Sequence, residues 1–491
     1  MRARWSSRTI FLFAAIGSAV GLGNIWRFPY MTYKYGGGAF LVPYLIALFV
    51  LGIPLLIMEF AIGQKLQKGA IDAFKTVNAR LRGIGFAAIF SGFVVVVYYA
   101  AVMAWSLVYF LRSWTNNLPW AADSKAYFFG EILHISEGVG HIGGINWTLF
   151  FALLAVWVMI YFCVWKGVKS AGKVVAITMP LPIILLVLLF IRGITLPGAL
   201  TGIGYYLLPD FNALFDAEIW LAAASQIFFT LSLAFGIMVA YASYNKPNQD
   251  LVKNGYITAI TNSAISLFAG FVVFAVIGYM SHTTGAAVAD VAVSGPGLAF
   301  VVFPQALSLM PLAGLFSVLF FLTLLSLGID SAFSLVEAVN TVIVDKAKNI
   351  AQKKIAAIVC LMAFVLGILF VTGAGLYFLD IFDHFVTKFG LVLVGIFECI
   401  AIGWIYGAER LRKWINSVSD WHLGSWWNLA IKWVIPIILT VLVVIQFMAE
   451  MTENYGGYPD WAIALGWLSV IIPILIGIIL AVKPGETKVN I

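Results

Sequence analysis

Oxygen-bearing side chains interrupt several apolar stretches of this 491-residue chain. Asp330 lies in the run Phe320–Ser331, and a carboxylate at such a place needs a partner and indicates a functional role. Hydroxyl and amide groups occur in other apolar stretches, at Ser18, Asn24, Thr230, Ser232, Asn262, Ser263, Ser266 and Ser331. Such oxygens solvate hard monovalent cations well. The five histidines are scattered, so we expect cation binding through oxygen and no transition-metal cluster.

The first apolar stretch contains a run that a continuous membrane helix would avoid, Gly17–Pro29. Its glycines are followed by Asn24, Arg27 and Pro29. Unpaired backbone groups are costly in hydrocarbon, so an unwound segment at this depth must face protein, water or a ligand. The run is therefore a candidate binding site. Close helix packing would explain any one of these glycines, and Arg27 alone could extend to the membrane surface.

Composition excludes an ordinary soluble protein, because apolar residues make up 62% of the chain and charged residues 10%. Apolar stretches of about 20 residues, long enough to cross a bilayer, recur along the chain. We predict an all-α integral membrane protein with twelve transmembrane helices, centred near residues 20, 50, 98, 157, 183, 230, 268, 328, 363, 396, 440 and 471. Residues 1–491 are expected to form a single transmembrane domain.

A second interrupted stretch, Ser225–Gly236, is the sixth predicted helix. Breaks in the first and sixth helices favour two inverted repeats of five helices, with the binding site at their interface. The first repeat (helices 1–5) would span about 9–193, the second (helices 6–10) about 217–408, and helices 11–12 about 429–482. Half-helix ends would offer N–H groups to an anion and C=O groups to a cation.

Charge predicts the orientation in the membrane. Most lysines and arginines fall at the helix ends on the side of the N-terminus, whereas acidic residues such as Asp123, Glu131 and Glu453 fall on the opposite side. The positive-inside rule then places both termini in the cytoplasm of a multi-pass cell-membrane protein. The net charge of +7 follows from this topology. A nucleic-acid partner would require a clustered basic face, and the sequence has none, so we expect no nucleic-acid partner.

Other intramembrane groups leave alternatives open. Glu59, Glu337 and Glu398 are consistent both with hydrogen bonding to the broken helices and with a part in transport. No nucleophile–base pair or ligand set occurs at mid-span, so we do not expect an enzyme. A channel would need a continuous polar pore, which Arg27 and neighbouring aromatic residues argue against.

Longer motifs resemble the neurotransmitter:sodium symporter family, in its order and over nearly the whole chain. They are Gly17–Pro29, Tyr35–Tyr44, Gly52–Glu59, Gln226–Leu233 and Leu327–Ser331. The short termini and compact loops of this chain resemble those of the prokaryotic amino-acid transporters of this family, such as the bacterial leucine transporter. The resemblance implies the family fold and secondary active import of a solute, driven by Na⁺ through alternating access.

The resemblance also implies two sodium sites. The first would use the Ala19 carbonyl, Asn24, Thr230, Asn262 and the substrate's own carboxylate. The second would use the carbonyls of Gly17, Val20 and Leu327 and the side chains of Asp330 and Ser331. Asp330 stands where the bacterial leucine transporter has Thr, and this carboxylate should strengthen Na⁺ binding.

A substrate site follows from the same resemblance. The substrate carboxylate would meet the N–H groups of Leu22 and Gly23 and the Tyr99 hydroxyl, and its amino group would meet Ala19, Phe229, Thr230 and Ser232. The side-chain pocket would consist of Ser18, Val95, Phe229, Ala234, Phe235, Ser331 and Leu335. Gly21 stands where monoamine transporters carry Asp, so the substrate must bring its own carboxylate. These walls favour a neutral amino acid, and Ala234 in place of a common Gly argues against the bulkiest side chains.

Gates and a chloride site complete what the resemblance implies. Arg27 and Asp383 match the outer gate below which Tyr99 and Phe229 form a lid, and Arg2, Trp5, Tyr244 and Asp345 match the inner gate. Gly172 and Pro182 fit the Gly-x₉-Pro pattern of the fifth helix, whose unwinding is thought to hydrate the second sodium site. Ser266 stands where prokaryotic members often hold a carboxylate, so we predict Cl⁻ dependence, with Tyr44, Gln226, Thr230 and Asn262 as further ligands.

Two other functions use the same fold. One is an H⁺-coupled or exchange amino-acid transporter, which the two oxygen-rich cation sites disfavour. The other is a non-transporting amino-acid sensor, which would bind its ligands without moving ions.

Overall fold

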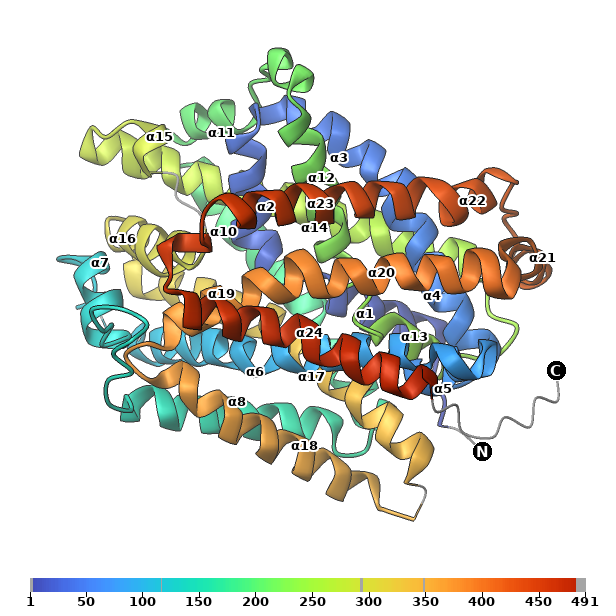
Figure 1. The fold of residues 1–491 in the computed structure, drawn as a ribbon. Helices are drawn as coiled ribbons and strands as arrows, with labels where there is room; N and C mark the ends of the chain where they lie inside the picture. Colours follow the sequence, from blue (N-terminus) through green and yellow to red (C-terminus); the bar gives the residue numbers. More distant parts are fainter. Residues whose placement is uncertain (1–2, 116, 292–294, 348, 483–491) are drawn as a thin grey trace.

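The computed structural model describes residues 3–115, 117–291, 295–347 and 349–482 (Figure 1). Over these ranges the regular elements are helices, apart from one isolated bridge between Ile145 and Thr372. Ten helical segments are long and apolar enough to cross a membrane, and the bent pair α1–α2 makes an eleventh. The prediction of an all-α membrane protein is confirmed.

Five spans come from the first part of the chain. They are α1 (Arg8–Ala19) with α2 (Leu22–Lys34), α3 (Leu41–Ala47) with α4 (Ile53–Leu66), α6 (Arg82–Arg112), α8 (Trp147–Val164), and α9 (Val168–Thr178) with α10 (Pro180–Ile194). The later spans are α12 (Ala217–Thr230) with α13 (Ile237–Ala242), α14 (Leu251–Thr284), α17 (Ala313–Lys346), α18 (Gln352–Gly367), α19 (Gly375–Phe385) with α20 (Leu391–Ile400) and α21 (Ala408–Val418), α23 (Ile435–Thr452), and α24 (Asp460–Val482). Short helices connect them: α5 (Ala70–Val77), α7 (Ser124–Ala126), α11 (Ala199–Leu207), α15 (Val288–Val291), α16 (Phe303–Ser308) and α22 (Trp426–Leu429).

Each predicted span centre falls within one of these spans, residue 20 between α1 and α2 and residue 50 between α3 and α4. The sixth span, however, has no membrane-length helix. Its two halves, α12 and α13, contain only 14 and 6 residues. The non-helical segment Leu231–Gly236 separates them. This shortness is the physical consequence of the break that the sequence predicts at Ser225–Gly236.

The broken helices lie inside the bundle. α1 contacts α9, α13, α14 and α17, and the long helices α6 and α17 pack against each other. In Figure 1, α8 and α18 run side by side along one edge of the molecule, as their contacts require. Large exposed apolar side chains, such as Phe151, Phe162 and Leu366, lie on these outer helices, which is the surface expected to face lipid. The apolar exterior thus surrounds a more polar centre.

The fifth span contains a proline-rich interruption of its helical hydrogen bonding. α9 ends at Thr178, Met179 forms a turn although its φ of −74° and ψ of −46° are helical, and α10 begins at Pro180. Pro180 and Pro182 have no backbone N–H, so the carbonyls four residues earlier, on Ala176 and Thr178, lose their helical donors. The backbone of this span is therefore weakest next to the centre of the bundle.

Candidate ion- and substrate-binding site

The first span is broken by two extended residues. α1 ends at Ala19, Val20 and Gly21 are extended, and α2 continues at a bend of 54°. Asn24 closes the start of α2, because its Oδ1 accepts a hydrogen bond from the Gly21 N–H at 2.8 Å. The C-terminal carbonyls of α1 and the N-terminal N–H groups of α2 therefore both end inside the protein. Such ends attract cations and anions respectively.

The break in the sixth span contains strained backbone. Ser232 and Ala234 have φ angles of +53° and +65°, and Gly236 has +71°. The segment is held at two points: Glu59 Oε1 accepts from the Ala234 N–H at 2.8 Å, and the Ser232 hydroxyl donates to the Ser18 carbonyl at 3.0 Å. The first bond fastens the break to α4, and the second fastens it to the end of α1 beside the other break. For Glu59, the structural alternative is the one that these contacts support.

Residues expected at the first sodium site meet in one buried cluster. Asn24 Nδ2 donates to Asn262 Oδ1 at 2.9 Å and to Ser266 Oγ at 2.7 Å. Asn262 Nδ2 donates to Thr230 Oγ1 at 3.1 Å. Ala19 lines the adjoining cavity. The cluster therefore brings amide and hydroxyl oxygens from α2, α12 and α14 within reach of one small cation.

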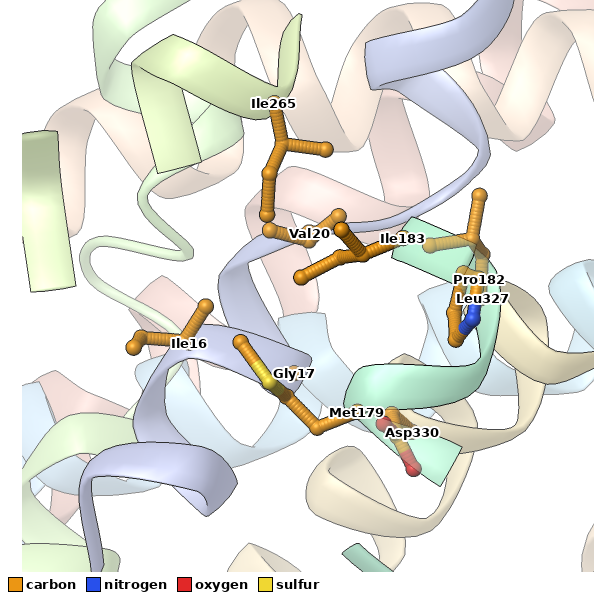
Figure 2. Close-up of a pocket in the computed structure, with 9 residues that line it drawn as sticks. All are labelled: Ile16, Gly17, Val20, Met179, Pro182, Ile183, Ile265, Leu327 and Asp330. Atoms are coloured by element: carbon orange, nitrogen blue, oxygen red, sulfur yellow. The ribbon is translucent and has the colours of Figure 1, made fainter. Parts of the chain in front are cut away.

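Asp330 faces α1 at a second, smaller pocket, shown in Figure 2. Its lining residues are Ile16, Gly17, Val20, Met179, Pro182, Ile183, Ile265, Leu327 and Asp330. The volume is about 10 Å³, which is room for a single water-sized sphere. A Cβ built on Gly17 would lie 2.6 Å from Asp330 Oδ2, so only glycine permits this approach. The residues expected at the second sodium site lie here, except for Ser331.

Ser331 lines the large central cavity and does not line the small pocket. Its hydroxyl donates to the Ser18 carbonyl at 3.3 Å, and a Cβ on Gly21 would lie 2.9 Å from its Oγ. In place of Ser331, Thr178 contacts Asp330 directly, through a hydrogen bond from its hydroxyl to Oδ1. The sequence analysis did not select Thr178.

The large cavity has a volume of about 870 Å³ and runs from the helix breaks to the ends of α2 and α19. It is lined by nearly all the residues expected to contact substrate, namely Ser18, Ala19, Gly21, Leu22, Gly23, Val95, Tyr99, Phe229, Thr230, Ser232, Phe235, Ser331 and Leu335. Ala234 is the exception, because it is fully buried behind the wall and its N–H is bound by Glu59. Tyr99 OH lies 3.4 Å from the Leu22 N–H, which donates to it.

The outer end of this cavity holds the expected outer-gate residues without a salt bridge between them. Arg27 stacks over the Phe229 ring, with Cζ 4.7 Å from its centroid, and Asp383 accepts a hydrogen bond from Tyr98 OH at 2.7 Å. Both line the cavity, as do Asp380, Lys388, Tyr455 and Tyr458, which the sequence analysis did not select. The cavity is therefore open toward this end.

The inner ends of the broken helices are closed. Trp5 is 6% exposed, and its Nε1 donates to the Tyr241 carbonyl at 2.8 Å. The Tyr244 hydroxyl lies 2.8 Å from Thr341 Oγ1, and Asp345 Oδ2 accepts from the Gly69 N–H at 2.7 Å. Arg2, the fourth expected member of this gate, lies outside the described residues.

A candidate anion site adjoins the first cation cluster. Gln226 is fully buried, and within the described ranges its amide nitrogen and oxygen have no hydrogen-bond partner. Tyr44 OH donates to Ser263 Oγ at 3.0 Å, and the Ser266 hydroxyl bonds the Asn262 carbonyl at 3.1 Å. A buried amide without a partner is costly, so an ion or water that satisfies Gln226 fits this position.

Comparison with known proteins decides the family. A profile of the sodium:neurotransmitter symporter family matches residues 2–127 and 121–484. The chain belongs to this family. It is 44% identical to an uncharacterised sodium-dependent transporter of Methanocaldococcus jannaschii, over 98% of this chain and 97% of the relative. It is 37% identical to the sodium- and chloride-dependent taurine transporter of Rattus norvegicus, over 100% of this chain and 86% of the relative. Identity to the sodium- and chloride-dependent glycine transporter 2 of Xenopus laevis is 35%, over 99% and 70%.

Family membership makes this protein a sodium-dependent symporter with a multi-pass membrane fold. In this symporter, the sequence predicts the two helix breaks and the oxygen-bearing residues around them. It does not predict that Thr178 contacts Asp330 or that Glu59 binds the Ala234 N–H. Thr178 carries one signal, since it lies inside the Gly172–Pro182 motif, but nothing in the sequence connects it with Asp330.

Proposed function

We propose that this symporter imports a neutral amino acid together with Na⁺ by alternating access, and that transport depends on Cl⁻. The observation that carries the proposal is the chemistry of the first oxygen cluster. Asn24, Thr230, Asn262 and the Ala19 carbonyl supply neutral oxygens only. Among the described residues lining the large cavity, the carboxylates are Asp380 and Asp383, at its outer end. A substrate carboxylate at the cluster would supply the missing negative charge.

The surroundings of Gly21 support an amino acid as the substrate class. A Cβ there would lie 2.9 Å from Ser331 Oγ and 3.3 Å from Tyr99 OH, so an Asp side chain would have to displace the Ser331 hydroxyl. A monoamine would therefore find no carboxylate, whereas an amino acid brings its own to the N-terminus of α2 and Tyr99. Val95, Phe235 and Leu335 form apolar walls, which favour an uncharged side chain.

Two sodium sites fit the two oxygen-lined positions. The first would hold Na⁺ among Ala19, Asn24, Thr230, Asn262 and the substrate carboxylate. The second would hold Na⁺ between Asp330 and the carbonyls of Gly17, Val20 and Leu327. The pocket volume of about 10 Å³ matches one small ion. Ser331 would join this second site only if its hydroxyl left Ser18.

Chloride dependence is supported by charge balance. Two Na⁺ ions and one zwitterionic substrate bring two positive charges to a region where Asp330 supplies one negative charge. The unpartnered Gln226 amide offers N–H donors for an anion close to the first cluster. The hydroxyls of Tyr44 and Ser266 would join it by turning from their present acceptors, Ser263 and the Asn262 carbonyl. Two of the relatives are named as chloride-dependent transporters, which is consistent with the same requirement here.

Alternating access is supported by the contrast between the two ends. The large cavity opens past Arg27 and Asp383, whereas Trp5 and Tyr244 close the opposite end. With both termini on the cytoplasmic side of the cell membrane, the open end of the cavity faces outward and the cycle imports substrate. In the occluded state Arg27 would pair with Asp383, above a lid of Tyr99 and Phe229.

The proposal is tested by screening ligands of the purified full chain. Thermal stabilisation is measured with each common amino acid, taurine and γ-aminobutyrate, in Na⁺ or K⁺ and with Cl⁻ or gluconate. We expect stabilisation by one or more neutral amino acids in Na⁺ only, strengthened by Cl⁻. Substrate-dependent flux of radiolabelled Na⁺ in proteoliposomes then separates a symporter from an amino-acid sensor. Uptake driven by a pH gradient without Na⁺ would instead favour an H⁺-coupled carrier.

A further inference from the structure

Thr178 lies where the weak point of the fifth span meets the second ion pocket. It is the last residue of α9, directly before Met179 and the proline that starts α10. Its hydroxyl is within hydrogen-bonding distance of two acceptors, the Val174 carbonyl at 3.0 Å and Asp330 Oδ1. Figure 2 shows Met179 and Pro182, which flank this turn, around the same opening as Asp330.

A threonine hydroxyl has one hydrogen, so it can donate to only one of these acceptors at a time. A bond to Val174 is local, since it ties the last turn of α9 to itself. A bond to Asp330 is long-range and charge-assisted, since it joins α9 to a carboxylate on α17. The choice of acceptor therefore decides whether the turn is fastened to α17.

Asp330 uses its two oxygens in different directions. Oδ1 accepts from Thr178, whereas Oδ2 faces Gly17, at 2.6 Å from the position of a Cβ on that residue. The carboxylate is 2% exposed, so it has few other orientations. The Thr178 hydroxyl thus turns Oδ2 toward the broken end of α1, where a cation would bind.

We propose that Thr178 is a positioning residue that orients Asp330 for Na⁺ and couples occupancy of this pocket to the conformation of the α9–α10 turn. A cation on the Oδ2 side holds the carboxylate in the orientation in which Oδ1 accepts from Thr178, so the hydroxyl stays on Asp330 in preference to Val174. Ion binding then fastens the end of α9 to α17, and the bound ion and this bond stabilise each other. This inference rests on the proposed second sodium site.

The test uses the full chain in detergent and Na⁺ alone as the probe, so it needs no identified substrate. Hydrogen–deuterium exchange of the segment 172–183 is measured as NaCl replaces KCl. In the wild type, Na⁺ should slow exchange in this segment. In Thr178→Val, which keeps the shape and removes the hydroxyl, the half-maximal Na⁺ concentration should rise about tenfold, the effect of losing one hydrogen bond to a charged group. Thr178→Ser should restore the wild-type response.

Thr323→Val is the matched control, because Thr323 makes the same type of bond to Leu319 on α17, at 2.7 Å, and has no contact with Asp330. It should respond like the wild type. Asp330→Asn distinguishes a failure of the proposed second sodium site from a failure of the proposed role of Thr178. If it responds to Na⁺ like the wild type, the second sodium site is wrong. If it loses the response while Thr178→Val keeps the wild-type Na⁺ dependence, the site stands and the role of Thr178 is overturned.

Discussion

Gly17 and Asp330 approach each other so closely that a Cβ on the glycine would lie 2.6 Å from the carboxylate oxygen Oδ2. The contact joins the broken end of α1 to α17, at the pocket proposed to hold the second Na⁺. It explains why a glycine stands at a position where the backbone itself is helical.

Gly17→Ala should displace the Asp330 carboxylate and weaken Na⁺ binding. Overpacking of this kind costs about 1–3 kcal/mol, so the half-maximal Na⁺ concentration for ligand-induced stabilisation should rise at least about fivefold. Gly204→Ala is the control, since nothing lies within 4 Å of a Cβ there. Equal Na⁺ dependence in both variants would contradict the assignment of this pocket.

Ala234 should be strained, because its φ of +65° is a conformation that favours glycine. Ala234→Gly is expected to stabilise the protein by about 0.5–1 kcal/mol, measured as the free energy of unfolding in detergent. Gly236→Ala, at φ +71°, should destabilise it. A loss of stability in Ala234→Gly would show that the Ala234 methyl group contributes more packing than strain.

Tyr98 should hold the outer end open, since its hydroxyl bonds Asp383 at 2.7 Å while Arg27 lies over Phe229. Tyr98→Phe leaves Asp383 free to pair with Arg27, which favours closure. A cysteine introduced at Leu376, on the cavity wall, should then react several-fold more slowly with a polar thiol reagent. Tyr109→Phe, on the same helix but bonded to Phe300, should leave the rate unchanged. A faster reaction in Tyr98→Phe would assign the opposite role to this bond.

Ser266→Glu should make binding independent of Cl⁻, because a fixed carboxylate would supply the charge that the anion provides. The midpoint of Na⁺-dependent thermal stabilisation by the amino acid found in the screen is compared in chloride and in gluconate. The wild type is expected to lose stabilisation in gluconate and the variant to keep it. Undiminished stabilisation of the wild type in gluconate would remove the case for a chloride site.

Sequence patterns predicted the helices and both breaks, because apolar length and clustered glycines are local signals. Asn24, Asn262 and Asp330 were also found locally, since polar groups inside apolar stretches are costly and few. The bonds from Thr178 to Asp330, from Ala234 to Glu59 and from Tyr98 to Asp383 join residues far apart in the chain. Such pairings depend on how the helices pack, and no periodicity of the sequence records them.

The same reason explains the two expected residues that lie elsewhere. Ala234 was assigned to the substrate pocket and Ser331 to the second sodium site by position in a motif. In the folded chain Ala234 turns behind the cavity wall, and Ser331 faces Ser18 on the cavity side of α1. Neighbouring residues in an unwound segment or along a helix point their side chains in different directions. Which residue contacts the site therefore depends on how the segment packs, and only the packed structure shows it.

The most direct test of the central claim is coupled flux in proteoliposomes containing the purified chain. A Na⁺ gradient is imposed, and uptake of the radiolabelled amino acid found in the screen is measured together with uptake of radiolabelled Na⁺. We predict that the amino acid accumulates against its gradient, that each uptake requires the other solute, and that Asp330→Asn abolishes both. Accumulation without Na⁺, or amino-acid binding with no substrate-dependent Na⁺ flux, would contradict Na⁺-coupled amino-acid symport.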